Sequence, residues 1–248
     1  MLLVVLVFLL PGCRSKAPEG TKLLLYCGAG IRPPVAELAA EYGRLHKVTV
    51  ECDYAGSEVL LSRIKLSCQG DLYMPGDVHY VELAEEQELV SSKKNVCYFV
   101  PVILVQKGNP KNIRTLEDLT RPELAVGLGD PEACAIGRKC SKIFEKNGIV
   151  EEEMDVAFRS LTVNELGNHI KLGMLDAVIV WDAVAALYGD VGEVVRIPPD
   201  QNIISTVAVG VLRSSEHPEL AGEFVEFITS DRGKEVFAKH DYSTTLPE

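Results

Sequence analysis

Apolar and polar residues follow two alternating patterns along the first third of the chain. Short apolar runs of strand length occur at residues 22–27, 48–54 and 71–74. Each run precedes a segment in which apolar residues recur at helical spacing, at 35–45, 58–67 and 78–88. This alternation predicts a doubly wound α/β unit with a parallel sheet. Ligands of such sheets bind at the carboxyl ends of the strands.

Two longer extended segments interrupt this pattern, at 95–106 and 203–211. Both are longer than an average strand, so each can cross between two parts of the molecule. A second α/β series lies between them, and two helices close the chain. The expected elements are helix 116–119, strand 125–127, helices 137–147 and 163–171, strand 177–181, and helices 218–230 and 231–240.

The order of these elements predicts an α/β protein of two lobes, each with a doubly wound sheet, joined by two crossing strands. Residues 22–100 and 206–248 are expected to form lobe 1, and residues 101–205 lobe 2. A cleft should lie between the lobes. Residues 1–21 are set apart as a signal segment and linker.

The N-terminal segment is an apolar run over residues 1–10 that ends in Pro11-Gly12-Cys13. It is too short to span a bilayer as a helix. The run is typical of a secretory signal, and its ending resembles a bacterial lipobox with Cys13 as the lipid-modified residue. We therefore expect an exported protein at the periplasm or outer cell surface, held at the membrane through this anchor. The alternative interpretation is a buried N-terminal strand.

Composition limits the partners of the chain. It has 248 residues with 47% apolar content, and 25 Lys+Arg against 36 Asp+Glu give a net charge of −11. Such a balance disfavours nucleic acids and anionic membrane surfaces. An anionic ligand would then have to be attracted by local dipoles.

The remaining cysteines are Cys27, Cys52, Cys68, Cys97, Cys134 and Cys140. Their even number in an exported protein permits disulfides. Cys27 and Cys52 end neighbouring predicted strands, where we expect buried free thiols. Neither the cysteines nor the scattered histidines have the spacing of a metal site.

Candidate chemistry lies in two strand-turn-helix segments. Residues 54–64 run from a strand through Ala55-Gly56-Ser57 into an amphipathic helix, and residues 28–34 repeat this arrangement after the first strand. Peptide N–H groups at the start of a helix lack intrahelical acceptors, and the helix dipole favours negative charge there. Two such turns could face one small oxyanion.

The chain after residue 22 resembles the periplasmic molybdate-binding proteins of ABC importers, which have the type II periplasmic binding protein fold. The resemblance rests on the order and spacing of several segments. They are the turns at 25–34 and 55–57, the run 70–77, the Asp130-Pro131-Glu132 motif, the strand 176–181 and the helix 223–228.

The resemblance implies ligand contacts at Gly30, Ser57, Ile136, Leu166 and Trp181. The family's first serine falls on Gly30, whose own N–H can replace the lost hydroxyl because glycine allows a close approach. Ser57 keeps both a hydroxyl and an N–H donor. Backbone donors fall near Ile136 and Leu166. The family's tyrosine falls on Trp181, whose indole N–H can donate a hydrogen bond.

We therefore expect a monomeric, non-enzymatic substrate-binding protein of an ABC importer, which binds molybdate or tungstate and delivers it to a permease. No cofactor and no metal beyond the oxyanion are expected.

Several alternatives remain open on the same fold. Sulfate is the nearest competitor. Phosphate becomes plausible if the carboxylate of Glu58 or Asp182 faces the cleft, and ferric ion would need clustered tyrosines and carboxylates. An enzyme of the porphobilinogen deaminase kind would hold a cofactor on Cys134 or Cys140. A sensor domain would bind the anion and signal to a partner protein.

Overall fold

The computed structural model describes residues 20–247. The predicted signal segment and its anchor residue Cys13 lie outside this range, apart from the last residues of the linker. Within residues 20–247, no helix combines the length and the apolar character that crossing a membrane requires.

The first sheet has the strand order β2-β1-β3-β10-β4. Strands β1, β2 and β3 are parallel, and β10 pairs antiparallel with β3 and β4. Five helices pack around this sheet, and together they form what we call lobe 1. Its elements are β1 (Lys22–Gly28), β2 (Thr49–Ala55), β3 (Leu72–Met74), β4 (Val90–Phe99), β10 (Ser205–Leu212), the short 3-10 helix η1 (Ala29–Ile31), α1 (Arg32–His46), α2 (Ser57–Ser67), α3 (Val78–Glu86), α7 (Pro218–Thr229) and α8 (Asp231–Lys239).

The second sheet has the strand order β7-β6-β8-β5-β9. Strands β6, β7 and β8 are parallel, and β5 runs antiparallel to β8 and β9. With its helices this sheet forms lobe 2. Its elements are β5 (Pro101–Gln106), β6 (Val126–Gly129), β7 (Val156–Ser160), β8 (Ala177–Trp181), β9 (Gly192–Arg196), α4 (Ala135–Lys146), α5 (Val163–Lys171), α6 (Asp182–Ala186) and the 3-10 helices η2 (Glu117–Thr120) and η3 (Glu151–Glu153).

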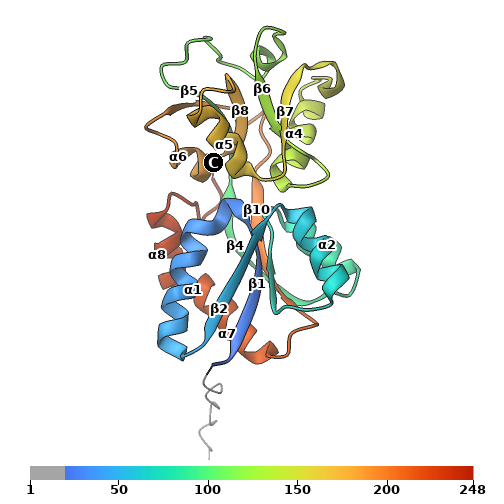
Figure 1. Cartoon of the computed structure of the whole chain (residues 1–248), viewed down its shortest axis with the longest axis vertical. Coiled ribbons are helices and arrows are strands. Elements are labelled where there is room, and N and C mark those ends of the chain that lie inside the picture. The colour runs from blue at the N-terminus through green and yellow to red at the C-terminus, as the bar shows by residue number, and fades with distance from the viewer. Residues whose placement is uncertain (1–19, 248) are drawn as a thin grey trace, which may run out of the picture.

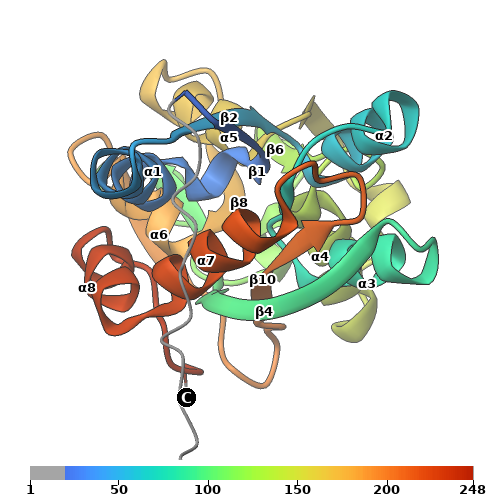
Figure 2. The ribbon, with the colours of Figure 1, turned by 90° about the horizontal axis from the view of Figure 1, so that it is seen from below.

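The two lobes lie one above the other and are joined where the chain crosses between them (Figure 1). The first crossing is at Val100, between β4 and β5, and the second leads from β9 into β10. Seen from below, α7 packs beside β10 and β4, and α8 packs against α7 and α1, so the C-terminal helices return to lobe 1 (Figure 2). The predicted two-lobed α/β fold is confirmed.

Three details differ from the sequence-based expectation. Both sheets are mixed rather than parallel, because β10 and β5 enter from the crossings in the opposite direction. The expected single strand at 95–106 is two strands that end and begin on either side of Val100. Strands β7 and β9 were not expected, because both are half exposed and carry charged residues among the apolar ones.

Burial explains why the lobes hold their shape. The interior strand β1 is apolar on both faces. Leu23, Leu25 and Cys27 are fully buried on one face, and on the other Tyr26 is buried and Leu24 half-buried. This pattern is typical of a parallel strand covered on both sides. The six described cysteines are free thiols. Cys27 is buried as expected, whereas Cys52 is free but only half-buried.

Candidate functional site

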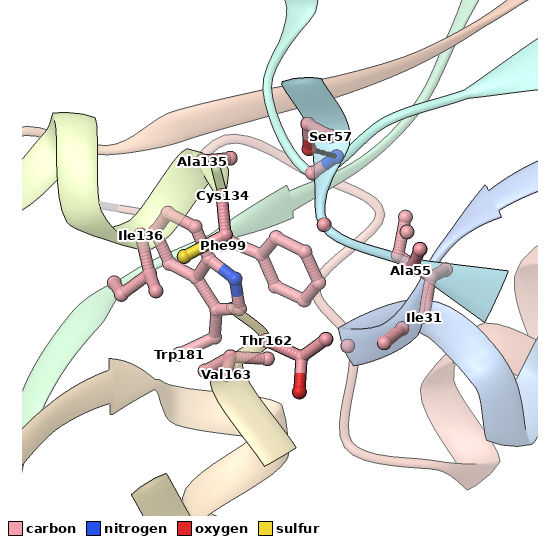
Figure 3. Close-up of a pocket in the computed structure, with 15 residues that line it drawn as sticks. Ile31, Ala55, Ser57, Phe99, Cys134, Ala135, Ile136, Thr162, Val163 and Trp181 are labelled. Atoms are coloured by element: carbon pink, nitrogen blue, oxygen red, sulfur yellow. Dashed lines mark hydrogen bonds between the residues drawn. The ribbon is translucent and has the colours of Figure 1, made fainter. Parts of the chain in front are cut away.

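A small cavity lies where the two lobes meet, and Figure 3 shows its walls. Its volume is about 20 Å³. One water needs about 10–15 Å³ by the same measure, whereas pockets for organic ligands reach about 300–1,000 Å³. The residues that line it are Gly28, Ala29, Gly30, Ile31, Ala55, Gly56, Ser57, Gly76, Phe99, Cys134, Ala135, Ile136, Thr162, Val163 and Trp181.

The wall from lobe 1 is built at the carboxyl ends of its parallel strands. Strand β1 leads directly into η1, and β2 leads through Gly56 into α2. Gly30 lies within η1 and Ser57 is the first residue of α2, so two helical N-termini border the cavity. Their first N–H groups lack intrahelical acceptors and favour an anion.

Ser57 is held in a defined orientation. Its side chain is buried, and its Oγ accepts a hydrogen bond from the Gly76 N–H at 3.1 Å. Its carbonyl oxygen accepts from the Tyr73 hydroxyl at 2.7 Å. Because Gly76 occupies a lone pair of Ser57 Oγ, the hydroxyl hydrogen remains available for donation into the cavity.

The wall from lobe 2 repeats the same design. Helix α4 begins at Ala135 and α5 begins at Val163, with Thr162 as its N-cap residue. Both follow parallel strands, β6 and β7, of the second sheet. With the two N-termini of lobe 1, four helix starts therefore converge on one cavity.

Trp181 ends β8 and lies at the centre of the site (Figure 3). Its ring stacks on Phe99, with centroids 4.9 Å apart and planes 4° from parallel. Its Nε1 atom is 3.9 Å from the place that a Cβ on Gly76 would take. No hydrogen bond among the described residues uses the indole N–H, so it is available to donate to a ligand.

The lobes touch through main-chain atoms beside the cavity. A Cβ added to Gly56 would lie 2.5 Å from both the Ala133 and the Leu161 carbonyl oxygens. The Glu58 N–H also donates to the Ala133 carbonyl oxygen at 3.1 Å. Only glycine allows this close contact between lobe 1 and two loops of lobe 2.

The cavity is electrically neutral apart from these dipoles. Its lining has no carboxylate and no cationic side chain. Cys134 is its one titratable side chain, and burial raises the pKa of that thiol to about 11, so it stays protonated at neutral pH. The site can therefore bind a ligand only through neutral donors and the helix dipoles.

The two carboxylates considered for phosphate binding do not line the cavity. Asp182 lines a separate cavity behind the crossing strands, where its carboxylate accepts a hydrogen bond from Val100 N–H at 3.1 Å. Burial raises the pKa of Asp182 above its usual value. Glu58 is half-buried and likewise contributes no lining atom.

Four of the five predicted contact residues come together around the cavity: Gly30, Ser57, Ile136 and Trp181. Their contact with a ligand stays a prediction. Gly30 is confined, because a Cβ there would lie 2.8 Å from Val163 Cγ1.

Leu166 is the exception. It does not line the cavity, since it lies one turn inside α5, fully buried with its side chain against Gly127. The start of α5, with Thr162 and Val163, faces the cavity instead, and contact of Leu166 with a ligand stays a prediction.

Sequence reasoning did not propose four residues of the lining as ligand contacts, namely Phe99, Ala135, Thr162 and Val163. Thr162 immediately precedes a predicted helix, where an N-cap residue is expected, so this signal could have been used. Gly76 belongs to the loop 75–77, which follows the third strand of the first series and was expected at the ligand edge of the sheet. Nothing in the sequence pairs Phe99 with Trp181.

The chemistry expected of an enzyme or a metal centre is not assembled among the described residues. No group of three or more His, Cys, Asp or Glu side chains within residues 20–247 could hold a metal ion. The thiols of Cys134 and Cys140 are both buried, and burial raises their pKa values.

Two sheets joined by two crossings, with a cavity between them, define the class of two-lobed solute-binding proteins. The chain belongs to the bacterial extracellular solute-binding protein family, whose model matches residues 23–243. Members of this family and the relatives described next are binding proteins of transporters, not enzymes.

Curated relatives support this assignment over nearly the whole chain. A putative binding protein of Haemophilus influenzae is 29% identical over 230 residues, covering 90% of this chain and 91% of the relative. The molybdate-binding protein ModA of Mycobacterium bovis is 23% identical over 245 residues, covering 94% of this chain and 92% of the relative.

Solved structures share the fold at low identity. The sulfate-binding protein SubI of Mycobacterium tuberculosis has a TM-score of 0.77 at 19% identity, covering 92% of this chain and 88% of SubI. The periplasmic molybdate-binding protein of Azotobacter vinelandii has a TM-score of 0.76 at 13% identity, covering 91% of this chain and all of that one.

Proposed function

We propose that this protein is the extracytoplasmic substrate-binding component of an ABC importer and that it captures a tetrahedral oxyanion, with molybdate or tungstate as the preferred ligand. The observation that carries the proposal is the convergence of four helix N-termini, the Ser57 hydroxyl and the Trp181 indole on one cavity without a carboxylate. The ligand would be delivered to a permease by a monomeric binding protein.

Neutral donors suit a fully ionised dianion. Such an ion needs many hydrogen bonds and offers no proton of its own, and helix N-termini supply oriented N–H groups for it. The cavity volume of about 20 Å³ favours a small inorganic ion over an organic phosphate. The molybdate-binding relatives agree with this ligand class.

Sulfate is the second candidate. It is a tetrahedral dianion of slightly smaller size, and the donor set described here contains nothing that would reject it. Hydrogen phosphate fits less well, because neither Glu58 nor Asp182 faces the cavity to accept its proton. Ferric ion also fits poorly, since no tyrosine or carboxylate is part of the lining.

Binding would proceed by hinge closure at the two crossings. An anion held first by η1 and the start of α2 would be completed by the donors of α4 and α5 when lobe 2 closes. Because these second donors exist only in the closed arrangement, the ligand would select that state. The predicted lipid anchor at Cys13 would keep the protein near its permease.

The direct test is calorimetry of the purified protein with molybdate, tungstate, sulfate and phosphate. We expect submicromolar to micromolar affinity for molybdate and tungstate and weaker affinity for sulfate, with phosphate weakest. Failure of all four anions to bind below about 1 mM, roughly −4 kcal/mol, would end the oxyanion proposal.

Ser57→Ala tests the site itself. Removing this donor should weaken anion binding by about 1–3 kcal/mol, because a buried charged acceptor loses a hydrogen bond. The matched control is Ser62→Ala, an exposed serine on the same helix, which should leave affinity unchanged. Equal affinity of the two variants would exclude Ser57 from the binding site.

A further inference from the structure

One ion pair crosses between the lobes. Lys139 of α4 lies with its Nζ 2.7 Å from Asp77 Oδ2, at the start of α3. Both side chains are about nine-tenths buried. The other ion pairs among residues 20–247 join residues of the same lobe.

Lobe 1 holds the Asp77 carboxylate in place for this pair. Its Oδ1 accepts from the His79 N–H at 2.9 Å, and its Oδ2 accepts from Ser205 Oγ at 2.6 Å. Burial alone would raise the pKa of Asp77, but the Lys139 ammonium and these hydrogen bonds hold it below its usual value. The carboxylate is therefore ionised at neutral pH.

The pair is connected to the candidate ligand site through hydrogen bonds. Ser205 Oγ also lies 3.0 Å from the Gly76 carbonyl oxygen, and Gly76 N–H donates to Ser57 Oγ at 3.1 Å. Gly76 and Ser57 both line the cavity. On the other side, Lys139 lies one helical turn after Ile136, near the start of α4.

We propose that Lys139, Asp77 and Ser205 form an interlobe latch, in which Lys139 is a positioning residue that holds the N-terminus of α4 against an anion bound on lobe 1. This inference rests on the proposed function of the same site. Rotation of lobe 2 away from lobe 1 would separate Lys139 from Asp77 and withdraw the donors of α4 in one movement.

A latch and an exposed attracting charge at Lys139 predict different changes in the rates of anion binding and release. The Asp77 carboxylate neutralises Lys139, so the pair contributes little long-range attraction to an approaching anion. Breaking a buried, hydrogen-bonded charge pair mainly accelerates dissociation, whereas removing an exposed steering charge slows association. The two mechanisms therefore differ in which rate constant changes.

The test compares Lys139→Met with Lys142→Met, an exposed lysine one turn away on the same helix. Exchange of radiolabelled molybdate from the full-length protein gives the off-rate, and calorimetry gives Kd. We expect Lys139→Met to raise both by roughly 30-fold or more, with the on-rate within about threefold of wild type. Lys142→Met should change neither.

Small-angle scattering measures the opening of the lobes in the absence of ligand. In protein without added anion, the radius of gyration of Lys139→Met should exceed that of wild type, because the open arrangement gains population. The radius of gyration tests the latch even if the wild-type protein binds no oxyanion. Such a lack of binding would contradict the proposed function and leave the latch standing.

Two further variants guard against a merely structural effect. Asp77→Asn keeps the acceptor for His79 N–H but loses the charge, so it should behave like Lys139→Met. It also gives the same readout should Lys139→Met fail to fold. The exchange Lys139→Asp with Asp77→Lys should recover part of the lost affinity. An unchanged radius and off-rate in both single variants, or a fall confined to the on-rate, would overturn the latch.

Discussion

Two cavities share a wall at the crossings, and they differ in nearly every property. The front cavity, between the lobes, has a volume of about 20 Å³ and is lined by Phe99 and Trp181. The rear cavity has a volume of about 880 Å³ and is lined by the next residues, Val100 and Asp182. Consecutive residues in extended chain point to opposite sides, so the same two segments serve both cavities.

The comparison of the two cavities shows on which side the lobes close against each other. On the front side the lobes touch through Gly56 and through the latch, and neutral donors converge on a space for a small ion. On the rear side the walls stay apart, and Asp182 and Arg196 are charged members of a mainly apolar lining. If the protein binds an anion as proposed, selection should depend on the front side alone, and changes on the rear side should leave affinity intact.

The largest effect is expected from Gly56→Ala on the front side. The backbone at Gly56, with φ −68° and ψ 152°, suits alanine, so lobe 1 should fold normally. The new Cβ would meet two carbonyl oxygens of lobe 2 at 2.5 Å and prevent full closure. We expect anion affinity measured by calorimetry to fall by about 3 kcal/mol, the upper range for overpacking.

Gly222→Ala is the control for that substitution, because a Cβ on this helical glycine meets nothing within 4 Å. It should leave affinity at the wild-type value. If Gly56→Ala bound the anion as tightly as this control, the lobes would not meet at Gly56 in the bound state.

A smaller effect is expected from Trp181→Phe. The phenyl ring can keep the stacking on Phe99 but lacks the N–H donor, so affinity should fall by about 0.5–1.5 kcal/mol. Trp181→Tyr returns a donor and should recover part of this loss. Equal affinity of the wild type and Trp181→Phe would show that the indole does not bind the ligand.

The smallest effect on binding is expected from Asp182→Asn on the rear side. Affinity should stay within about 0.5 kcal/mol of wild type, as for substitutions away from a site. A larger loss would contradict the separation between the two cavities.

The same variant should alter stability in a pH-dependent way. The pKa of Asp182 is raised above 3.8 in the folded protein, so the folded state binds this proton more tightly than the unfolded state. Wild type therefore loses stability as pH rises from 3.8 through the raised pKa. Thermal unfolding should find Asp182→Asn at least as stable as wild type at pH 7, with the difference shrinking as pH falls toward 4.

The sequence was sufficient to predict the fold and most of the front lining. Apolar periodicity and turn residues report on local structure, and the parallel strands bring their carboxyl ends to one edge, so the turns at 28–34 and 55–57 were expected to face one ligand. The resemblance then singled out Gly30 and Ser57 within these turns. The start of α5 was predicted at Val163, whereas the resemblance gave a ligand contact near Leu166, which lies further along the helix and outside the lining.

Contacts between the lobes could not be predicted in the same way. Lys139 and Asp77 are separated by 62 positions, and each alone has the pattern of an ordinary polar residue on a helix or at its N-cap. Their pairing depends on the relative orientation of two sheets, which no local pattern encodes. The stacking of Phe99 on Trp181 escaped prediction for the same reason.

Trp181 is the only tryptophan of the chain. Its ring lies against Phe99 of the other lobe and beside the cavity, so the environment of the indole changes whenever the lobes move or an ion enters. The indole emission of this protein therefore comes from a single side chain at the boundary between the lobes. Unlabelled protein can thus report binding and closure optically, with no background from a second indole.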